Sequence, residues 1–383
     1  MLRFGTPEGH EFAQVVRRLI DDHFRPHEDR IDRDDLATTE ELRGFRRRSA
    51  AIGAVGFNLP EKIGGAGLSF ADQVLVGIES GRVTTVLSEH IGYLPDSLQF
   101  ASPAQISSLV EPLVSGDAAL AYALTEPSGG SDLGSISTGA SRTGSGWQIS
   151  GTKQFITNAA HADFVLVLAV TAPSAPLAER FTVFVVQRDD VGFEVTERYR
   201  TMGWRGHQLN GLRLDSCVVG EDRVLGQVGR GFEVIMATIN GGRLNVAARC
   251  LGAADRALQT AVDFASDRMV AGRRLTEHGM TQQKLADMDV DLRAAMLLVA
   301  EAAQCGDEGT LDFRTAVSRA KLFATEMAGR VADQAIQVLG AAGYTTDYPL
   351  ERIARDVRGY RIGEGTSEIQ RIQIARALVK SRS

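Results

Sequence analysis

The chain has 383 residues, of which 44% are apolar, so it is long enough for a large core divided among about two or three subdomains. Its 42 basic and 48 acidic residues give a net charge of −6, which argues against a protein built to bind nucleic acid non-specifically. Three cysteines, Cys217, Cys250 and Cys305, are too few and too scattered for a disulfide framework or a zinc site, and they are typical of a reducing cytoplasm.

No targeting or membrane-spanning segment is indicated. Residues 1–11 lack an apolar run after a basic start, and no stretch approaches about 18 uninterrupted apolar residues. We therefore expect a cytoplasmic protein with no membrane or nucleic acid partner. His23 and His27 have the i, i+4 spacing of a metal site, but they lack a matching second pair. Two exposed polar residues are the preferred interpretation, and no metal is predicted.

The first part of the chain, residues 8–118, is predicted to be helical. Val16 and Leu19 belong to an apolar stripe at helical spacing. Ser69 is predicted to open a helix that runs to about Glu79. The segment after this helix is expected to be cut into short helices by three prolines, Pro95, Pro103 and Pro112.

Beyond about residue 120 the pattern changes to strands. Several runs are apolar or alternating and have the length of a strand. Because no helical segments of roughly 10–15 residues separate them, an antiparallel barrel or sandwich is favoured over a parallel sheet. The runs cover residues 147–150, 164–170, 181–186, 212–215 and 217–219.

From about Gly231 the chain is predicted to be helical again. No proline occurs between Pro176 and Pro349, which permits long uninterrupted helices. The last long apolar stripe is expected to end at Gly340 and Gly343. An earlier stripe comprises Leu285, Met288, Leu292, Met296 and Leu297. The chain is thus predicted to be α+β, with a helical domain over residues 1–119, a β domain over 120–228 and a second helical domain over 229–383.

Near the end of the chain, Glu364 stands between Gly363 and Gly365. Ser367 and Gln370 have the spacing of a capping box, so a helix is predicted to start at Ser367. The two glycines leave the carboxylate free of neighbouring side chains, which is the access that a general base needs. On this segment alone, an ordinary solvated loop carboxylate is the more common explanation.

A second segment, residues 122–131, joins the helical part to the strands. Its small residues leave main-chain N–H groups and hydroxyls free to face a ligand. It lacks the strand–GxGxxG–helix order of a dinucleotide fingerprint. From these residues alone, a plain Gly/Ser loop and a cofactor cradle are equally good interpretations, and Phe155, Ile156 and Thr157 read as an ordinary edge strand.

Together these segments, Tyr122 to Asp132 and Arg361 to Gln370, closely resemble the acyl-CoA dehydrogenase flavoprotein family. The resemblance runs in order from about residue 50 to about 380. It implies an N-terminal helical domain, a central antiparallel β domain and a C-terminal four-helix bundle. It also implies an FAD cofactor, an acyl-CoA or acyl-carrier-protein thioester as substrate, and an electron-transfer flavoprotein or other electron acceptor as partner. A homotetramer, or a dimer, is expected from the family alone.

The resemblance assigns the flavin contacts residue by residue. Thr125 would reach the pyrimidine edge, Ser131 the phosphate or the substrate thioester, and Thr157 the region of the reactive nitrogen, while Phe155 would cover the ring system. The cofactor-binding residues that it implies are Tyr122, Leu124, Thr125, Gly130, Ser131, Phe155, Ile156, Thr157, Arg268, Gln337, Gly340, Thr366 and Glu368.

Arg268 and the segment from Gln337 to Tyr344 would reach the flavin of a neighbouring subunit. Around Arg268 the sequence departs from the family pattern. Val270 and Ala271 replace a polar residue and Phe, and Gly279 replaces a common glutamine. The end of the cofactor site between subunits could therefore be looser than in relatives.

For catalysis, the resemblance makes Glu364 the base that removes the substrate α-proton and Arg243 the arginine that positions it. Many relatives place the base just before this arginine, where this chain has Gly242. Family members usually have Tyr at the position of Gly363, so we hypothesise a pocket for a bulkier or differently attached acyl group. The substrate-binding residues that it implies are Ser131, Asn240, Arg243 and Gly365.

Three alternatives stay open. The first is a flavin-dependent oxidase or monooxygenase on the same fold, which the presence of Glu364 disfavours. The second is a non-catalytic binding relative, which the acidic net charge disfavours where the partner is nucleic acid. The third is the same chemistry on a carrier-protein thioester. His207 stands where the family usually has Ser, and it reads equally well as a surface loop histidine or as a substrate contact.

Overall fold

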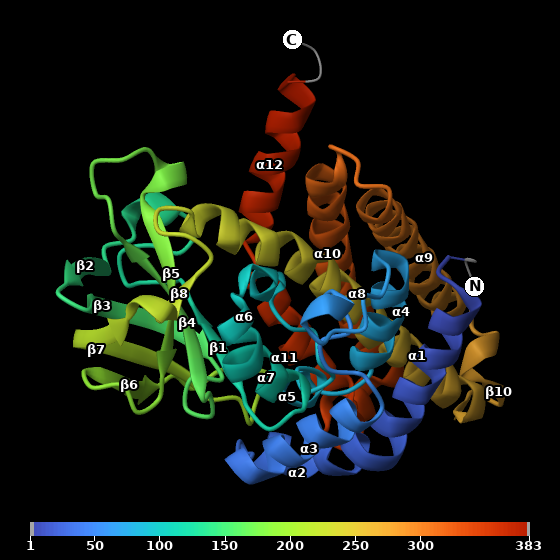
Figure 1. The fold of residues 1–383 in the computed structure, drawn as a ribbon. Coiled ribbons are helices and arrows are strands. Elements are labelled where there is room, and N and C mark those ends of the chain that lie inside the picture. Colours follow the sequence, from blue (N-terminus) through green and yellow to red (C-terminus); the bar gives the residue numbers. More distant parts are fainter. Residues whose placement is uncertain (1–3, 381–383) are drawn as a thin grey trace.

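The computed structural model describes residues 4–380, with helices in the first and last parts of the chain and a sheet between them. Figure 1 shows the sheet on one side of the molecule. The first and last helices lie together on the other side, although the sheet separates them in sequence. The predicted α+β class, in the order helices, strands, helices, is confirmed.

The N-terminal helices begin where polar caps are available. The Ser69 side chain accepts a hydrogen bond from the Asp72 N–H at 3.1 Å, and a helix begins at the next residue, as predicted. Pro112, however, does not interrupt the helical conformation, which continues through residues 103–114. A π turn just before it shifts the hydrogen-bond register, so the proline lies in the first turn of a new α segment, where its missing N–H is tolerated. The elements are α1 (Pro7–Leu19), α2 (Glu28–Asp34), α3 (Thr39–Ala51), α4 (Phe70–Ser80), α5 (Thr85–Ser88), α6 (Pro103–Gln105), the π turn (Ile106–Val110) and α7 (Glu111–Val114).

The strands form one twisted sheet with the order β6-β7-β3-β2-β4-β5-β8, and β1 pairs with β4. The pairs are antiparallel, as predicted, except that β4 is parallel to both β1 and β2. Residues 212–215 and 217–219 belong to one strand rather than two, because Ser216 (φ 54°) makes a local irregularity without ending the pairing. The strands are β1 (Leu120–Ala123), β2 (Gly139–Thr143), β3 (Gly146–Thr157), β4 (Phe164–Val170), β5 (Phe181–Gln187), β6 (Phe193–Arg198), β7 (Leu209–Gly220) and β8 (Val224–Leu225).

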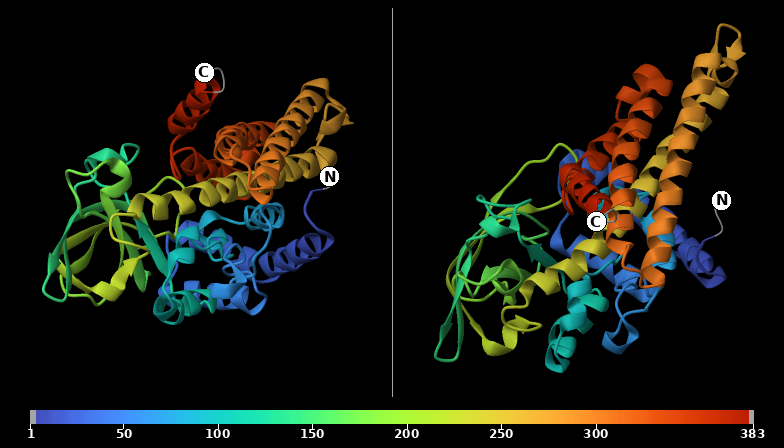
Figure 2. Two further views of the ribbon diagram at one scale, coloured as in Figure 1. Left: turned by 45° about the horizontal axis from the view of Figure 1, so that its top comes forward. Right: turned by 90° about the horizontal axis from the view of Figure 1, so that it is seen from above.

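Three long helices make the C-terminal part. Figure 2 shows α8 running from the sheet to the far tip of the molecule, where the chain turns back into α9. The residues of the apolar stripes are buried or half-buried, with the exception of Leu297, which is 56% exposed. The third helix ends before Gly340, whose φ of 62° suits glycine. The elements are α8 (Gly231–Asp267), β9 (Met269–Val270), β10 (Arg273–Arg274), α9 (Gly279–Asp307), α10 (Phe313–Leu339), α11 (Leu350–Tyr360) and α12 (Ser367–Lys380).

The predicted domain limits at 119/120 and 228/229 fall between α7 and β1 and between β8 and α8. The last helix, α12, projects away from the rest of the molecule (Figure 1). Among the described residues, no helix combines the length and apolarity needed to cross a membrane.

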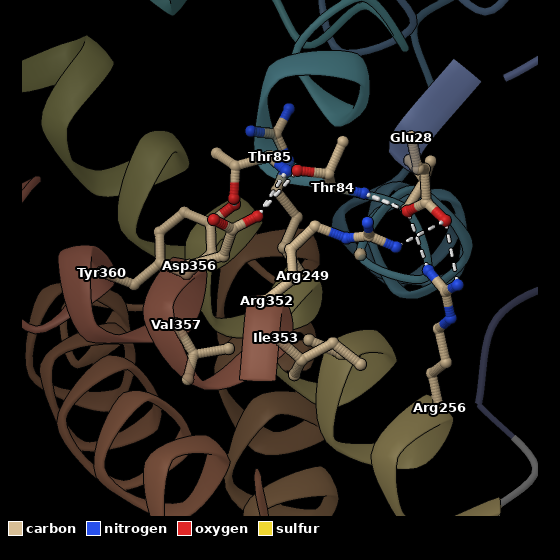
Figure 3. Close-up of a pocket in the computed structure, with 13 residues that line it drawn as sticks. Glu28, Thr84, Thr85, Arg249, Arg256, Arg352, Ile353, Asp356, Val357 and Tyr360 are labelled. Atoms are coloured by element: carbon tan, nitrogen blue, oxygen red, sulfur yellow. Dashed lines mark hydrogen bonds and ion pairs between the residues drawn. The ribbon is translucent and has the colours of Figure 1, made fainter. Parts of the chain in front are cut away.

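A buried ion cluster joins the first helices to the last ones. Figure 3 shows a small cavity into which the Glu28 side chain points from α2. Its carboxylate accepts hydrogen bonds from the Thr84 N–H at 2.7 Å and from Arg256 of α8 at 2.8 and 2.9 Å, and it lies 3.5 Å from Arg352 of α11. Glu28 is 1% exposed. A buried carboxylate shared by two arginines fixes three helices relative to one another.

We expect Glu28→Ala to lower the free energy of unfolding by about 3–5 kcal/mol, because Arg256 and Arg352 would keep their buried charges without the carboxylate that they share. Denaturant unfolding of the purified protein measures this change.

The matched control is Glu40→Ala. The Glu40 side chain is 75% exposed and pairs with Arg43 across one helical turn, so its loss should stay within about 0.5 kcal/mol. Equal effects of the two substitutions would show that the Glu28 cluster does not hold the helices together.

Candidate functional site

One cavity of about 820 Å³ is lined by residues from the first helices, the sheet and the last helices. It brings together the two segments on which the sequence predictions rest, residues 122–131 and 363–365, which are far apart in the chain. The predicted site residues that line it are Tyr122, Leu124, Thr125, Gly130, Ser131, Phe155, Ile156, Thr157, Arg243, Glu364 and Gly365.

Glu364 lies on a short irregular segment between α11 and α12. Its backbone is left-handed, with φ 53°, and Gly365 follows with φ 84°. A left-handed conformation costs a non-glycine residue about 1–3 kcal/mol, so the surrounding structure has to impose it.

Hydrogen bonds to two consecutive carbonyl oxygens impose this conformation. The Arg243 Nε–H donates to the Glu364 carbonyl at 3.1 Å, and the fully buried Lys321 Nζ donates to the Gly365 carbonyl at 2.7 Å. The Gln370 side-chain amide donates to the same two carbonyls, at 3.3 and 2.9 Å. Three side chains from α8, α10 and α12 therefore fix the backbone on which the carboxylate stands.

The start of α12 at Ser367 is confirmed, but the predicted capping box is wrong. The Thr366 hydroxyl accepts from the Ile369 N–H at 3.3 Å, so Thr366 caps the helix. The Ser367 hydroxyl instead donates to Glu326 at 2.9 Å. Gln370 does not complete a capping box, because the Ser367 N–H donates to the Arg361 carbonyl at 3.1 Å instead of to the Gln370 side-chain oxygen.

The Glu364 carboxylate lies over Gly242 of α8. A Cβ atom at Gly242 would be 3.1 Å from Oε2 and 3.2 Å from Cδ of Glu364. The two positions where a base is expected in this family pattern are therefore adjacent in space, and glycine at one leaves room for the carboxylate of the other.

Glu364 as a whole residue is exposed, and it lines the cavity, where the neighbouring protein still removes part of the hydration of its carboxylate. Burial raises the pKa of Glu364, while the charges of Arg243 and Lys321 lower it. Burial also lowers the pKa of Arg243 to about 10 and that of Lys321 to about 8. A carboxylate with a raised pKa beside two cations is suited to accept a proton at neutral pH.

The opposite wall comes from the sheet. Phe155 has φ 57° where the register between β3 and β7 shifts, and its ring packs on Tyr199 with centroids 4.7 Å apart. The side chain is 49% exposed although it lines the cavity. An apolar ring held open on a strained backbone fits a flat aromatic ligand.

The loop that precedes this wall is anchored by Glu126. Its carboxylate accepts hydrogen bonds from the N–H groups of Ser137 and Thr138 at 2.8 and 2.9 Å and from Lys153 at 2.9 Å. Burial raises the pKa of Glu126, but the charge of Lys153 and these hydrogen bonds lower it more strongly, so the pKa falls to about 2. The loop carrying Thr125 and Ser131 is thus tied to the sheet by an ionised, satisfied carboxylate.

Six predicted residues lie outside the cavity lining. Asn240 does not line the cavity, although Ile239 and Gly242 on either side of it in the sequence do. Thr366 caps α12, and Glu368 is exposed in the first turn of that helix. The remaining three are exposed at the ends of α8 and α10, namely Arg268, Gln337 and Gly340.

The space beside Gly363 is bordered by Trp204. The indole lies 3.7 Å from where a Cβ of Gly363 would stand, and its Cζ2 would be only 2.5 Å from a Cβ of Gly359. Its Nε1–H donates to the Asp356 carbonyl at 2.7 Å, and its N–H to the Asp356 carboxylate at 2.6 Å. Gly359 and Gly363, at the C-terminal end of α11, thus leave space for the Trp204 ring from the sheet domain. This ring fills part of the space that a Tyr at position 363 would otherwise take.

The sequence prediction missed two residues beside the base. Lys321 carried a usable signal: it stands at helical spacing from the buried Val317 and Ala324, on a face where an unpaired charge is not tolerated. Trp204 gave no such signal, because its contact depends on glycines far along the chain. His207 is not a surface residue: it is 7% exposed and lies 3.8 Å from Glu89.

Comparisons with known proteins agree with this geometry. Models of the acyl-CoA dehydrogenase N-terminal, middle and C-terminal domains match residues 6–117, 121–217 and 229–379. The human mitochondrial short-chain specific acyl-CoA dehydrogenase is 35% identical, over 98% of this chain and 91% of its own length.

Solved structures give the same result. Butyryl-CoA dehydrogenase from Megasphaera elsdenii superposes with a TM-score of 0.91 at 30% identity, covering 99% of this chain and all of its own (100%). A chain described with the electron transferring flavoprotein of Acidaminococcus fermentans gives 0.92 at 29% identity, covering 99% of both chains. A glutaryl-CoA dehydrogenase from Mycobacterium smegmatis in complex with FADH2 gives 0.89 at 27% identity, covering 98% and 95%. The chain belongs to the acyl-CoA dehydrogenase family of FAD-dependent oxidoreductases.

Proposed function

We propose that this cavity is the active site for α,β-dehydrogenation of an acyl-CoA, with Glu364 as the base that removes the α-proton. One observation carries the proposal: the Glu364 carboxylate and the wall formed by Thr125, Ser131 and Phe155 line the same cavity. The product is a trans-2-enoyl thioester. A carboxylate at this place favours the dehydrogenase over an oxidase, a monooxygenase or a non-catalytic relative.

The residues present fit FAD. Thr125, Ser131 and Thr157 offer hydroxyls on the wall where Phe155 presents an exposed ring, as a polar-edged, flat ring system requires. We assign Thr125 to the pyrimidine edge, Thr157 to the neighbourhood of the reactive nitrogen and Phe155 to the ring face. When bound, FAD supplies the acceptor for the hydride that leaves the β-carbon, which no side chain of the protein can accept.

The protein side of the reaction is proton removal and charge stabilisation. The hydrogen bonds from Arg243, Lys321 and Gln370 to the carbonyls of residues 364 and 365, here called the clamp, fix the backbone that carries the carboxylate. A fixed backbone lowers the entropy cost of bringing the carboxylate to the α-carbon. Removal of the α-proton moves negative charge toward the thioester carbonyl. A main-chain N–H near Glu364 is proposed to donate a hydrogen bond to that oxygen and to stabilise the charge as it develops.

The assembly and partners belong to the same proposal. Arg268 and Gln337 are exposed and lie outside the cavity of their own chain, which supports their action on the cofactor of a neighbouring subunit in a homotetramer or a dimer. An electron-transfer flavoprotein is the proposed acceptor, supported by the structural likeness reported above. A cytoplasmic location is supported by the free thiols of Cys217, Cys250 and Cys305.

The first test is Glu364→Gln. Anaerobic mixing of holoenzyme with a panel of saturated acyl thioesters, CoA-linked and carrier-linked, should bleach the oxidised flavin band in the wild type. In the variant, the rate of bleaching should fall about 10²–10⁴-fold, because the general base is lost while the side-chain volume is kept. The absorbance of bound FAD reports that the variant is folded and loaded.

Glu301→Gln, an exposed change on α9, is the matched control and should bleach like the wild type. Normal bleaching by Glu364→Gln would remove Glu364 from the role of base. Substrate-dependent oxygen uptake without anaerobic bleaching would favour the monooxygenase alternative.

The second test concerns Lys321. Its charge lowers the pKa of Glu364, so removing it should raise that pKa and move the acidic limb of the pH profile of kcat/KM to higher pH. Because the pKa of Lys321 is about 8, the wild-type enzyme carries this charge only below that pH. The loss of activity should therefore be largest at acidic pH and smallest above pH 8.

Two substitutions separate charge from hydrogen bonding. Lys321→Gln keeps a donor for the Gly365 carbonyl, and Lys321→Met removes both donor and charge. Both should show the shifted limb, and Lys321→Met should also lose activity at every pH. Identical pH profiles in the wild type and both variants would contradict an electrostatic role for Lys321.

A further inference from the structure

Away from Glu364, the cavity wall contains buried cationic and imidazole side chains. We call Arg46 of α3, His90 after α5 and Arg249 of α8 the distal cluster. All three line the cavity, and they are 7%, 5% and 5% exposed, respectively. The three come from separate parts of the chain, so their meeting at one wall is a property of the fold.

The distal cluster has hydrogen-bond donors that the protein does not satisfy. Across residues 4–380, none of the three guanidinium nitrogens of Arg46 has a hydrogen-bond partner. His90 Nε2 and Arg249 Nε are likewise buried without a partner within the described chain. An unsatisfied buried donor costs about 1–3 kcal/mol, and more for a charged group. Such a cluster indicates a ligand that supplies the missing acceptors.

The charged residues nearby do not satisfy these donors. Glu89 lies 3.9 Å from Arg249 and 3.8 Å from His207, outside hydrogen-bond distance of both. Asp163 attracts Arg46, but burial lowers the pKa of Arg46 to about 10, which leaves it charged at neutral pH. Burial lowers the pKa of His90 well below its usual value, so its imidazole is neutral. The cluster is therefore cationic, with Arg46 as the unpaired charge.

Printed contacts place the distal cluster away from the base. The Glu364 carboxylate lies over Gly242 of α8, and Arg249 stands seven residues farther along the same helix, roughly 10 Å at about 1.5 Å per residue. Arg249 donates to the Ser88 carbonyl at 3.2 Å, two residues before His90, and the main chain of Arg46 packs against Gly116, beyond α7. A substrate that places its α-carbon at Glu364 therefore extends its far end along the wall that carries the distal cluster.

We propose that the distal cluster binds a carboxylate at the far end of the acyl chain, so that the substrate is a CoA monothioester of a dicarboxylic acid. An Arg guanidinium binds a carboxylate through two parallel hydrogen bonds, and His90 and Arg249 can supply further donors. An apolar chain end would leave these donors buried and unsatisfied. The inference rests on the proposed function, because it deepens the specificity of the same site.

The experiment compares three thioesters of equal chain length with the holoenzyme: the dicarboxylic monothioester, its methyl ester and the unsubstituted acyl-CoA, over a series of lengths. At the best length, kcat/KM for the free carboxylate should exceed that for the methyl ester by roughly 10- to 100-fold, the effect of hydrogen bonds to a charged group. Arg46→Met should collapse this ratio, and Arg46→Lys, which keeps the charge, should retain part of it.

Arg47→Met is the control variant. Arg47 is the next residue of α3, but its side chain is 55% exposed and pairs with Asp117 at 2.7 Å, so the ratio should stay at the wild-type value. Calorimetric titration of the same thioesters into Glu364→Gln holoenzyme gives affinities without turnover. There too, the carboxylate should bind more tightly than the methyl ester, and the difference should disappear when Arg46→Met is added.

The outcomes distinguish the two proposals. Oxidation of unsubstituted acyl-CoA with no preference for the carboxylate at any length would overturn the distal carboxylate site and leave the proposed function standing. Absence of flavin bleaching with every thioester would overturn the proposed function itself. A carboxylate preference that survives Arg46→Met would also contradict the assignment to the distal cluster.

Discussion

The constraint on which the site depends is the clamp on the carbonyls of residues 364 and 365. A buried lysine is expensive, because burial removes its hydration, and Lys321 is fully buried. Its hydrogen bond to the Gly365 carbonyl, together with the contacts of Arg243 and Gln370, recovers part of this cost. These hydrogen bonds hold residues 364 and 365 in a left-handed conformation that an isolated chain would not keep. The position of the carboxylate is thus set by main-chain contacts, which leave its side-chain oxygens free for chemistry.

A second buried group, the Asp356 carboxylate, also fixes main-chain segments through hydrogen bonds. The Asp356 carboxylate accepts from the Thr84 hydroxyl at 2.8 Å and from the Thr85 and Trp204 N–H groups at 3.1 and 2.6 Å. This single group joins the first helices, the sheet domain and α11, and α11 leads directly into the segment that carries Glu364. Together with the Glu28 cluster, it makes the relative placement of the three parts depend on buried, mutually satisfied charges.

Much of the fold could be predicted from the sequence, because local rules decide it. Apolar, β-branched runs such as residues 164–170 became strands with the predicted limits, and Ser69 opened its helix as expected. The failures occur where tertiary contacts overrule a local rule. Ser367 has good capping chemistry, but Glu326 of α10 takes its hydroxyl. Pro112 should interrupt a helix, but the π turn before it absorbs the disruption.

In the candidate site, too, some residues could be predicted from the sequence and others could not. Glu364 could be found because two segments of the sequence together resemble a known family; its own neighbours, two glycines and a helix start, also suit an ordinary loop carboxylate. Arg46 could not, since its sequence context, three consecutive arginines on a helix, is that of a surface face, and only packing shows that one of the three is buried. A resemblance to a family transfers residues that act on the shared cofactor and the shared base. It does not transfer the wall that receives the variable end of the substrate, because that wall is built from side chains of unrelated segments.

Volume is also redistributed around the base rather than simply lost. Glycine at 242 admits the Glu364 carboxylate, and glycines at 359 and 363 admit the Trp204 ring from another domain. Each of these replacements keeps the wall closed while it changes which element supplies it. Trp204 donates two hydrogen bonds to Asp356, so the wall beside the base is held by the carboxylate that also binds Thr84 and Thr85 of the first helices. Elsewhere on the cavity wall, the Arg46 guanidinium has no hydrogen-bond partner among the described residues, so a ligand there would not compete with an internal contact.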